Sequence, residues 1–426
     1  MHARNILILP AGTEIGLEIF NALKNCKEAC LFAAGQDISN HARFIYDNYH
    51  LVPATHEDGC AEILIELCRR LAIDYIFPAH DDVITFLGTI RDQLPAAVIA
   101  PSQEICEITR YKSRTYEILA DAVRIPRTYT NPDEVDIYPV FVKPDRGQGS
   151  FGARLIHDRE GLSLALKERS DLLICENLSG TEYTIDCFSD RDHGILFAGA
   201  RVRHRMRNGI AVSTETVDLP EAATMARRIH GKLPIPGAWF FQAKRSENGE
   251  LTLLEVAPRI AGSMATHRVL GINFPLLSIF EHERIPLSIT PNPLSVKLDR
   301  ALSNRYQHTI IFDALYVDLD DTLLVNGRIS EEVILLIFQS INDGKKIILL
   351  TRHHGELRET LDRHRITDLF DEVIHLKNGE KKSGFIREQN AILIDDSYSE
   401  RMDVSRNCNI LTFDPSMIEL LTRGRR

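Results

Sequence analysis

Continuous apolar runs of strand length alternate with segments of helical spacing along the first hundred residues. The strand-like runs are residues 6–9, 75–78 and 97–100, and the helical patterns lie around residues 17–23, 61–71 and 83–91. Strands that alternate with helices predict a parallel sheet that is covered on both faces. We therefore predict an α/β domain over residues 1–101.

After residue 101 the pattern becomes richer in strands. The predicted strands are residues 140–143, 172–176, 183–188, 195–200, 238–244 and 251–256, and the predicted helices lie around residues 115–122, 160–169 and 221–232. This mixture predicts an α+β domain over residues 102–289.

Residues 290–309 contain prolines and few periodic apolar positions, so we predict a linker there. Beyond it, buried-type strands separated by helices predict a compact, doubly wound domain over residues 310–426. Those strands are residues 314–317, 346–350, 391–394 and 410–413.

Composition and charge narrow the class of protein. The 426 residues include 44% hydrophobic and 26% charged side chains, which are values typical of globular proteins. The formal net charge of −10 argues against a nucleic-acid partner, because such partners require a basic surface. No apolar stretch approaches the roughly 20 residues of a membrane-spanning helix. The eight cysteines form no CxxC pair, and we interpret them as free thiols of a cytoplasmic protein. The formation of a homo-oligomer is left open.

Residues 12–16, Gly-Thr-Glu-Ile-Gly, lie between a predicted strand and a predicted helix, where phosphates often dock. The segment is neither a GxGxxG motif nor a Walker A loop, which would end in Gly-Lys-Ser/Thr. We interpret it as a tight turn of a structural or substrate-side domain and do not place ATP there.

A stronger nucleotide signal follows the strand that ends in Lys143. The next segment is rich in glycine and includes Gly147, Gly149, Ser150 and Gly152. Glycines let backbone N–H groups approach a triphosphate closely, and the lysine supplies a positive charge. Because a flexible surface loop would have a similar composition, this segment alone leaves both interpretations open.

Further positions, in a defined order along the chain, have side chains suited to ATP and magnesium. They are Lys112, Glu176, Leu178, Glu182, Gln242, Glu255 and Arg259. The acidic groups after the strand 172–176 suit hydrogen bonds to adenine and ribose. Glu255 offers the carboxylate oxygens that Mg²⁺ prefers, and Arg259 would neutralise the charge that develops on a transferred phosphoryl group.

This ordered set resembles the ATP-grasp superfamily, in particular its carbamoyl-phosphate-synthase-like and biotin-carboxylase-like branches, over residues 1–289. The resemblance implies an ATP-grasp fold with an N-terminal pre-ATP-grasp domain, and it implies ATP and Mg²⁺ as cofactors. It assigns the ATP phosphates to Lys112, Lys143 and residues 147–152, the adenine to Glu176 and Leu178, the ribose to Glu182, the magnesium to Gln242 and Glu255, and a phosphate or acyl phosphate to Arg259.

The family chemistry implies that ATP phosphorylates a small-molecule carboxylate and that an amine then displaces phosphate. One departure concerns the usual Glu-x-Asn-Pro-Arg pattern, in which Ala257 replaces the asparagine that often helps to bind a second magnesium ion. The number of metal ions therefore stays open. Two alternatives also stay open: a phosphotransferase in place of a ligase, and a non-catalytic binding or regulatory module.

Alternate arginines at positions 201, 203, 205 and 207 precede an Asn-Gly turn. Strand alternation would place these charges on one face, which is costly unless an anion meets them. We predict that Arg203 and Arg205 bind a substrate anion, with a solvated strand end as the alternative. His267 and Arg268 are further candidates for the substrate pocket.

A second set of polar residues follows strands of the C-terminal domain. Asp318 and Asp320 follow the first strand, Thr351 ends the second, Lys382 comes next, and Asp395 and Asp396 end the third. The carboxyl ends of parallel strands are where such folds place chemistry. Crowded carboxylates need a cation, for which Mg²⁺ is suited.

In this interpretation Asp318 attacks the phosphorus of a phosphoester and Asp320 protonates the leaving oxygen. Thr351 and Lys382 would bind phosphoryl oxygens. Asp395, with Asp396, would complete a metal site to which Asp318 and Asp320 contribute.

These motifs, in this order, resemble haloacid dehalogenase-like phosphatases over residues 310–426. Lys382 is preferred over Lys381 because Phe385 and Ile386 follow it at family-like spacing. The short segments between the motifs leave no room for a cap domain. The resemblances together imply a bifunctional enzyme that combines an ATP-dependent ligase with a magnesium-dependent phosphatase.

Overall fold

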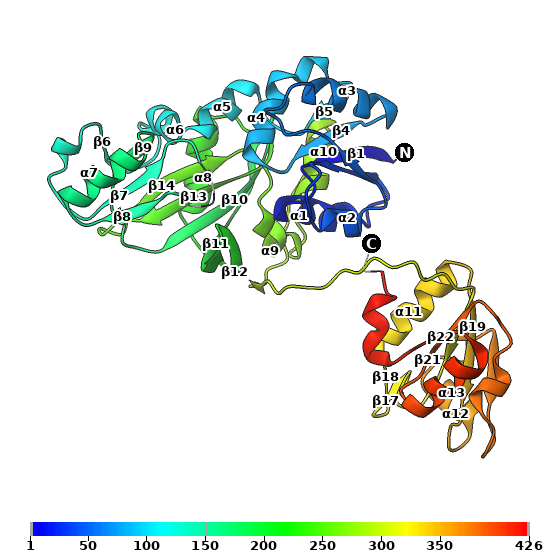
Figure 1. The fold of residues 1–426 in the computed structure, drawn as a ribbon. Coiled ribbons are helices and arrows are strands. Elements are labelled where there is room, and N and C mark those ends of the chain that lie inside the picture. Colours follow the sequence, from blue (N-terminus) through cyan, green and yellow to red (C-terminus); the bar gives the residue numbers. More distant parts are fainter. Residues whose placement is uncertain (1–2, 148, 150, 424–426) are drawn as a thin grey trace. The chain divides into compact units, whose positions relative to one another are not determined.

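The chain divides into two compact units, Met1–Leu302 and Ser303–Arg426. The computed structural model describes residues 3–147, 149 and 151–423, and Figure 1 shows their secondary structure coloured along the sequence. The boundary between the units lies inside the predicted linker 290–309. Within the described ranges, no helix is both long enough and apolar enough to cross a membrane.

The first unit begins with a parallel sheet in the order β3-β2-β1-β4-β5. Its strands are β1 (Arg4–Leu9), β2 (Ala29–Gly35), β3 (Tyr49–Leu51), β4 (Tyr75–Pro78) and β5 (Ala97–Val98), and its helices are α1 (Glu14–Leu23), α2 (Ala42–Ile45), α3 (Cys60–Arg70) and α4 (Asp81–Thr89). Ile6 and Ile8 of β1 enter one apolar core, whereas Leu7 and Leu9 enter another. The sheet is therefore buried on both faces, and the predicted parallel α/β arrangement is confirmed.

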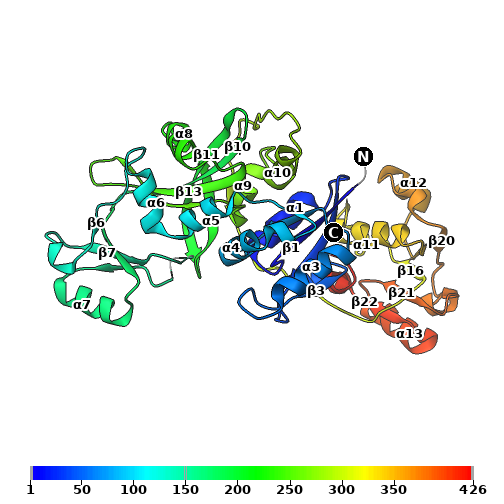
Figure 2. The same cartoon turned by 90° about the horizontal axis from the view of Figure 1, so that it is seen from above.

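Helices α5 (Gln103–Arg110) and α6 (Lys112–Leu119) lead from this sheet into the strand-rich centre. Helix α5 packs against α4, beside which it lies in Figure 2, and against β14 (Leu251–Ala257). The contact brings the end of β14 close to the start of α4, and both contribute to the pocket described below.

Two antiparallel sheets form the centre of the first unit. The smaller has the order β6-β9-β7-β8 and consists of β6 (Thr128–Tyr129), β7 (Val140–Pro144), β8 (Arg154–Ile156) and β9 (Leu172–Glu176). Helix α7 (Arg159–Glu168) packs on it through Leu162 and Ala165.

The larger sheet has the order β14-β13-β10-β11-β12-β15. Its remaining strands are β10 (Glu182–Asp190), β11 (Gly194–Arg207), β12 (Ile210–Val217), β13 (Gly237–Arg245) and β15 (Lys297–Asp299). Helix α8 (Ala222–Lys232) packs against β11, and α10 (Phe274–His282) packs against β13. The predicted strand-rich α+β centre is thus present.

Strand β15 corrects the predicted linker. It pairs antiparallel with β12, through Ser213 opposite Asp299 and Glu215 opposite Lys297. The linker prediction is therefore wrong for residues 297–299, which form the edge of the larger sheet. The strand was missed because it is short and two of its three residues are charged, and its pairing partner lies far away in the sequence.

The second unit contains a parallel sheet in the order β20-β19-β16-β21-β22. Its strands are β16 (Ala314–Val317), β19 (Lys346–Thr351), β20 (Glu372–His375), β21 (Ala391–Ile394) and β22 (Leu411–Phe413), with helices α11 (Glu331–Asn342), α12 (Leu357–Arg363) and α13 (Tyr398–Cys408) and a small hairpin of β17 (Leu324–Val325) and β18 (Arg328–Ile329). Leu315 and Val317 of β16 enter one core, whereas Ala314 and Tyr316 enter the other. The predicted doubly wound arrangement is present, with β20 as a strand that the sequence pattern missed.

Candidate active sites

A cavity of about 500 Å³ in the first unit gathers most of the residues predicted for ATP, magnesium and the carboxylate. The predicted residues that line it are Lys112, Lys143, Gly147, Gly149, Glu176, Leu178, Glu182, Arg203, Gln242, Glu255 and Arg259. Gly152, Arg205, His267 and Arg268 are not among the lining residues, and Ser150 lies outside the described residues. We call this cavity the ligase pocket.

Two lysines bring positive charge to the start of the glycine-rich segment. Lys143, at the end of β7, is buried and donates hydrogen bonds from Nζ to Tyr116 Oη at 2.5 Å and to the Leu254 carbonyl at 3.2 Å. Lys112, at the start of α6, donates to the carbonyls of Asp145 and Gly147. Burial lowers the pKa of Lys143, because the charged ammonium is deprived of water. An anion bound here would compensate for the hydration that the Lys143 ammonium has lost.

The glycine-rich segment also contacts the turn between β11 and β12. An added Cβ on Gly209, whose φ is +76°, would overlap with the backbone of Gly149. Only glycine permits this approach without strain, because its φ is in the left-handed region. The segment and the turn therefore meet at the edge of the ligase pocket, which both of these glycines line.

Gln242 and Glu255 face each other across β13 and β14. The Oε1 atom of Gln242 accepts a hydrogen bond from Arg203 Nη2 at 3.0 Å, and the same arginine forms an ion pair with Glu182. In the described parts of the chain, no ion pair involves the carboxylate of Glu255. These two oxygen donors on one wall of the pocket fit Mg²⁺, which prefers carboxylate and amide oxygens together with phosphate.

Arg259 follows β14 and is held by a residue that the sequence analysis missed. Its Nε and Nη2 atoms donate to Asp81, at the start of α4, at 2.5 Å and 2.9 Å. Although burial acts in the opposite direction, the Asp81 carboxylate raises the pKa of Arg259. The guanidinium is thus charged, and Asp81, from the domain that contains the parallel sheet of the first unit, orients it within the ligase pocket.

A buried cluster lies beside the pocket and corrects the prediction for His267. Asp186 of β10 is fully buried and accepts hydrogen bonds from Arg201 Nε at 2.8 Å and Nη2 at 3.0 Å. His267 Nδ1 lies 2.8 Å from the same carboxylate. His267 therefore supports Asp186 rather than lining the cavity. Arg268 is likewise occupied by an ion pair with Glu18.

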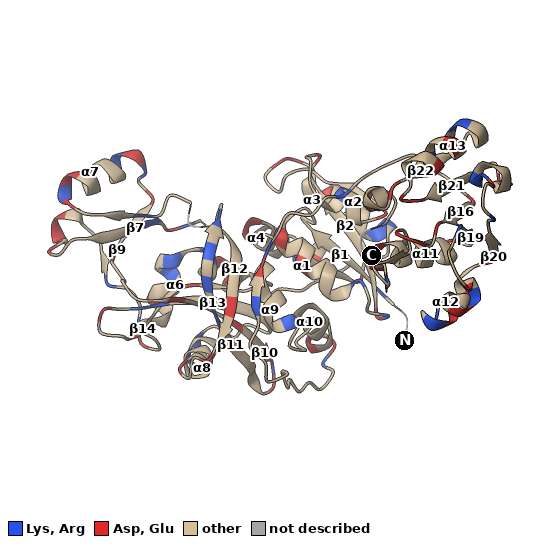
Figure 3. Cartoon of the chain, turned by 90° about the horizontal axis from the view of Figure 1, so that it is seen from below, with Lys and Arg blue, Asp and Glu red and all other residues tan. Residues whose placement is uncertain are grey.

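The arginine run of β11 does not share one face. The pairing of β11 with β12 shifts register between Arg203 and Arg205 and again between Arg205 and Met206. Arg201 and Arg203 line the pocket, whereas Arg205 is exposed and pairs with Asp299 of β15 at 2.8 Å. The prediction that Arg205 faces the substrate is therefore wrong, because a bulge resets the alternation of side chains. Figure 3 shows the basic stretch at the end of β11 in blue.

Several lining residues were not among the predicted site residues. They are Thr13, Glu14, Asp81, Arg110, Arg201 and Arg300, of which Arg201 belongs to the arginine run that the sequence analysis marked. The segment 12–16 gave a weak signal, since its position before α1 is one where ligands often bind. Arg300 lies in the predicted linker and gave no signal.

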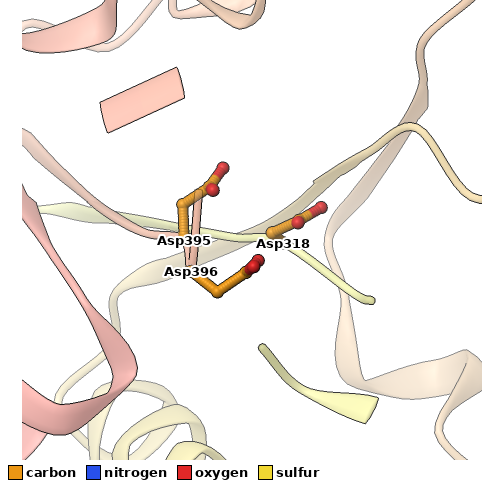
Figure 4. Close-up of side chains that lie close together, drawn as sticks. All are labelled: Asp318, Asp395 and Asp396. Carbon is orange, nitrogen blue, oxygen red and sulfur yellow. The ribbon is translucent and has the colours of Figure 1, made fainter. Parts of the chain in front are cut away.

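In the second unit, three carboxylates meet at the ends of two neighbouring strands. Asp318 follows β16, and Asp395 and Asp396 follow β21. One carboxylate oxygen from each lies within 4.8 Å of the others, and Figure 4 shows the three side chains together. We call this group the carboxylate cluster. Because β16 and β21 are parallel neighbours, their carboxyl ends lie at the same edge of the sheet.

Lys382 is the cation that the protein itself supplies to the carboxylate cluster. Its Nζ lies 2.9 Å from Asp318 Oδ1 and 2.5 Å from Asp395 Oδ2. The side chain of Lys382 is 3% exposed, whereas that of Lys381 is 74% exposed and pairs with Asp403. The preference for Lys382 over Lys381 thus agrees with the geometry.

The electrostatics of the cluster favour an additional cation. Burial raises the pKa of Asp318 to about 6 and also raises the pKa of Asp395, although Lys382 acts in the opposite direction on both. Asp396 accepts a hydrogen bond from Thr322 Oγ1 at 3.2 Å. The buried hydroxyl of Thr351 has no hydrogen-bond partner among the residues that the structure describes. Three oxygen donors and an unused hydroxyl fit a divalent cation with a phosphoryl group.

Asp320 does not join the carboxylate cluster. Its side chain lies on the turn before the β17–β18 hairpin, and both of its carboxylate oxygens are 3.0 Å from His353 Nδ1. The predicted metal contact through this side chain is therefore not present. His353, which also contacts Thr360 Oγ1 at 2.8 Å, was missed because it follows the strand-end Thr351 by two residues in a polar loop.

The match to a protein family lies within the first unit. Residues 168–294 match the family described as ATP-grasp in the biosynthetic pathway with Ter operon. A 3-methyl-D-ornithine–L-lysine ligase of Methanosarcina mazei is 31% identical over 121 residues, which are 28% of this chain and 30% of that protein. Its counterpart in Methanosarcina acetivorans is 26% identical over 149 residues, 34% of this chain and 38% of that protein. The matched segments thus span little more than a third of these relatives at most.

Solved structures give the fold. The biotin carboxylase domain of a Hydrogenobacter thermophilus 2-oxoglutarate carboxylase, in complex with MgADP and bicarbonate, has a TM-score of 0.58 at 17% identity and covers 68% of this chain and 72% of its own. An L-amino acid ligase from Bacillus licheniformis has a TM-score of 0.55 at 17% identity and covers 68% of this chain and 76% of its own. The second unit is much shorter than the part of this chain that these structures cover, so the likeness must include the first unit. The first unit therefore has the ATP-grasp fold.

Proposed function

We propose that the first unit is an ATP-dependent ligase that joins a carboxylate to an amine and uses Mg²⁺. The observation that carries this proposal is the convergence of Lys143, the glycine-rich segment and the Gln242–Glu255 pair on one cavity. The ATP-grasp fold and the matched ATP-grasp family support it, and enzymes of this fold use ATP and Mg²⁺.

In the proposed reaction a carboxylate oxygen takes the γ-phosphoryl group of ATP, which gives an acyl phosphate and ADP. An amine then attacks the acyl carbon, so that a C–N bond forms, the bond to the phosphate oxygen breaks and inorganic phosphate leaves. Lys143 and Lys112 hold the ATP phosphates, and Arg259 contacts the transferred group. Gln242 and Glu255 would hold Mg²⁺, which would neutralise phosphate charge when bound. The glycine-rich segment would exclude water from the acyl phosphate.

We propose amino acids as the substrate class. The curated relatives are named for the joining of 3-methyl-D-ornithine and L-lysine, and both partners of that reaction are amino acids. The matched segments cover only part of those relatives, so the proposal extends to the class of substrate and not to these two compounds.

The ligase proposal is tested by measuring ADP release from ATP with pairs of amino acids and by identifying the products by mass spectrometry. We expect ADP and phosphate release to require both an acid and an amine, and we expect an amide product. ADP release that leaves a stable phosphorylated acid would instead favour the phosphotransferase alternative. Absence of ADP release with every pair, together with intact ATP binding, would favour a non-catalytic module.

For the second unit we propose a magnesium-dependent phosphomonoester hydrolase of the haloacid dehalogenase-like type, without a cap domain. The supporting observation is the carboxylate cluster with Lys382 at the carboxyl ends of parallel strands. Asp318 would attack phosphorus and expel the alcohol, and water would then hydrolyse the aspartyl phosphate. Asp320 would donate the proton to the leaving oxygen and then activate the water.

The cluster would hold Mg²⁺ through Asp318, Asp395 and Asp396, and the ion when bound would offset the phosphoryl charge. Lys382 and the free hydroxyl of Thr351 would bind phosphoryl oxygens. Hydrolysis of p-nitrophenyl phosphate with and without Mg²⁺ tests this proposal. We expect turnover that EDTA removes and Mg²⁺ restores, and turnover that ignores both treatments would contradict it.

A further inference from the structure

The arginines of the ligase pocket differ in whether a carboxylate of the protein neutralises them. Four of the lining arginines form ion pairs: Arg110 with Asp82, Arg201 with Asp186, Arg203 with Glu182 and Arg259 with Asp81. Arg300 is the lining arginine for which the described chain provides no ion pair. Its guanidinium therefore has no direct carboxylate partner within the described residues.

The structure holds Arg300 in place through its backbone and one side-chain nitrogen. Its backbone N–H donates to the Val212 carbonyl at 2.8 Å, which continues the pairing of β15 with β12. Its Nη2 atom donates to the carbonyl of Gly262. Burial lowers the pKa of Arg300, although the carboxylates of Glu14 and Glu18 act in the opposite direction. A partly desolvated guanidinium with unused donors is costly unless an anion binds to it.

Glu14 also contacts Gly262. An added Cβ on Gly262 would lie 2.8 Å from Glu14 Cγ, so the side chain of Glu14 packs directly against this glycine. Glu14 lines the pocket from the start of α1, and within the described residues its carboxylate forms no ion pair. Among the described residues, the cavity is therefore lined by a cation and an anion that form no ion pair, and both contact Gly262.

We propose that Arg300 and Glu14 form a subsite for a free amino acid, in which Arg300 binds the carboxylate and Glu14 binds the ammonium group. This subsite takes the amine substrate and rests on the ligase function proposed above. A ligand with only one charge would leave the other side chain unpaired, so the subsite selects ligands that have both. Arg300 lies beyond residues 168–294, the segment that matches the ATP-grasp family, so the match does not assign it a role.

The test measures amino acid binding by isothermal titration calorimetry to the full-length protein saturated with Mg²⁺ and adenylyl imidodiphosphate. Each of the twenty common L-amino acids is titrated, and the tightest binder is compared with its amide and with its N-acetyl derivative. We expect each derivative to bind roughly 10- to 150-fold more weakly, because each loses one charge-assisted contact.

Variants then assign the two contacts. Arg300→Ala is expected to weaken binding of the amino acid by roughly 10- to 150-fold and to abolish the difference between the acid and its amide. Glu14→Gln is expected to abolish the difference between the free and the N-acetylated amino group. Lys297→Ala is the matched control, because it removes an exposed positive charge from β15 outside the cavity, and it should bind like the wild type. Melting temperatures establish whether each variant is folded. If Arg300→Ala does not fold, Arg300→Lys is measured in its place.

Two results would overturn the subsite: an Arg300 variant that binds the amino acid as tightly as the wild type, or no binding of any amino acid. ADP release by Lys143→Ala separates this failure from failure of the ligase itself. If Lys143→Ala abolishes ADP release while Arg300→Ala leaves amino acid affinity unchanged, the ligase stands and the subsite is wrong. If Lys143→Ala releases ADP at the wild-type rate, the ligase proposal fails as well.

Discussion

The ligase pocket and the carboxylate cluster differ in how the charges of their side chains are balanced. In the pocket most arginines face a carboxylate of the protein, as Arg259 faces Asp81 and Arg201 faces Asp186. In the cluster three carboxylates crowd together around Lys382. The paired arginines are thus balanced before any ligand binds, whereas the cluster has excess negative charge.

This difference in charge balance indicates which kind of ligand each site requires. Because the pocket arginines are already paired, they are oriented by the protein, and substrates add contacts to an organised wall. The carboxylate cluster needs a cation before it is electrostatically balanced, so metal binding and the ionisation of Asp318 are coupled. We therefore expect changes in the cluster to be sensitive to metal and pH, and changes in the pocket to appear in substrate affinity.

The largest expected effect is in the cluster. Asp318→Asn should lower the hydrolysis of p-nitrophenyl phosphate by about 10³-fold or more, because an amide is a poor nucleophile. ADP release by the first unit should stay unchanged, since Asp318 belongs to the second unit. Full phosphatase activity in this variant would remove Asp318 from the mechanism.

A similarly sharp effect is expected in the pocket. Lys143→Ala should lower ATP-dependent ligation by about 10²–10³-fold, because the phosphates lose a buried positive charge. Hydrolysis of p-nitrophenyl phosphate by the same protein should be unaffected. If both activities disappeared while the protein remained folded, the two sites would not be independent and the comparison would fail.

The bulge in β11 makes a prediction about substrate affinity. Arg203→Ala should raise the KM for a substrate by roughly 10- to 150-fold, because a charge-assisted contact is lost at the pocket wall. Arg205→Ala, which removes an exposed arginine paired with Asp299, should change the KM by less than about twofold. Equal effects of the two changes would mean that Arg203 and Arg205 lie on the same face of β11, as an unbulged strand would place them.

The smallest expected effect concerns pH. The folded pKa of Asp318, about 6, lies above its ordinary 3.8, so its contribution to stability is full below the lower value and is lost as the pH rises through the higher one. Mg²⁺ binds the ionised carboxylate and should compensate for this loss. We expect Mg²⁺ to raise the melting temperature of the second unit by roughly 5 °C at pH 7.5 and by less than about 2 °C at pH 5.

Calorimetry of the full-length protein checks this, with Asp318→Asn as the control. Because this variant lacks the titrating group, the effect of Mg²⁺ should vary less between the two pH values. A stabilisation by Mg²⁺ that is greater at pH 5 would contradict the assignment of Asp318 as the group that links metal to pH.

The features that could be predicted from the sequence are those encoded within a few residues of each other. The strand before Lys143 with the glycines after it, and the strand before Asp318, could be recognised locally. The rule that parallel neighbours end at the same edge then predicted that Asp318 and Asp395 would meet, as they do. The prolines and the few periodic apolar positions of residues 290–309 predicted a boundary between domains there, and the two units meet at Leu302 and Ser303.

The pairing of the charges in the ligase pocket could not be predicted from the sequence, because it depends on contacts between distant segments. Asp81 and Arg259 are separated by 178 residues, and nothing around either one indicates the other. The shift of register that turns Arg205 to solvent depends on how β11 pairs with β12 and is invisible in β11 alone. Arg300 reaches the pocket because the three residues before it add an edge strand to a sheet formed far upstream. Periodicity reports which face of an element is buried, whereas register and long-range pairing are set by the partner that the element meets.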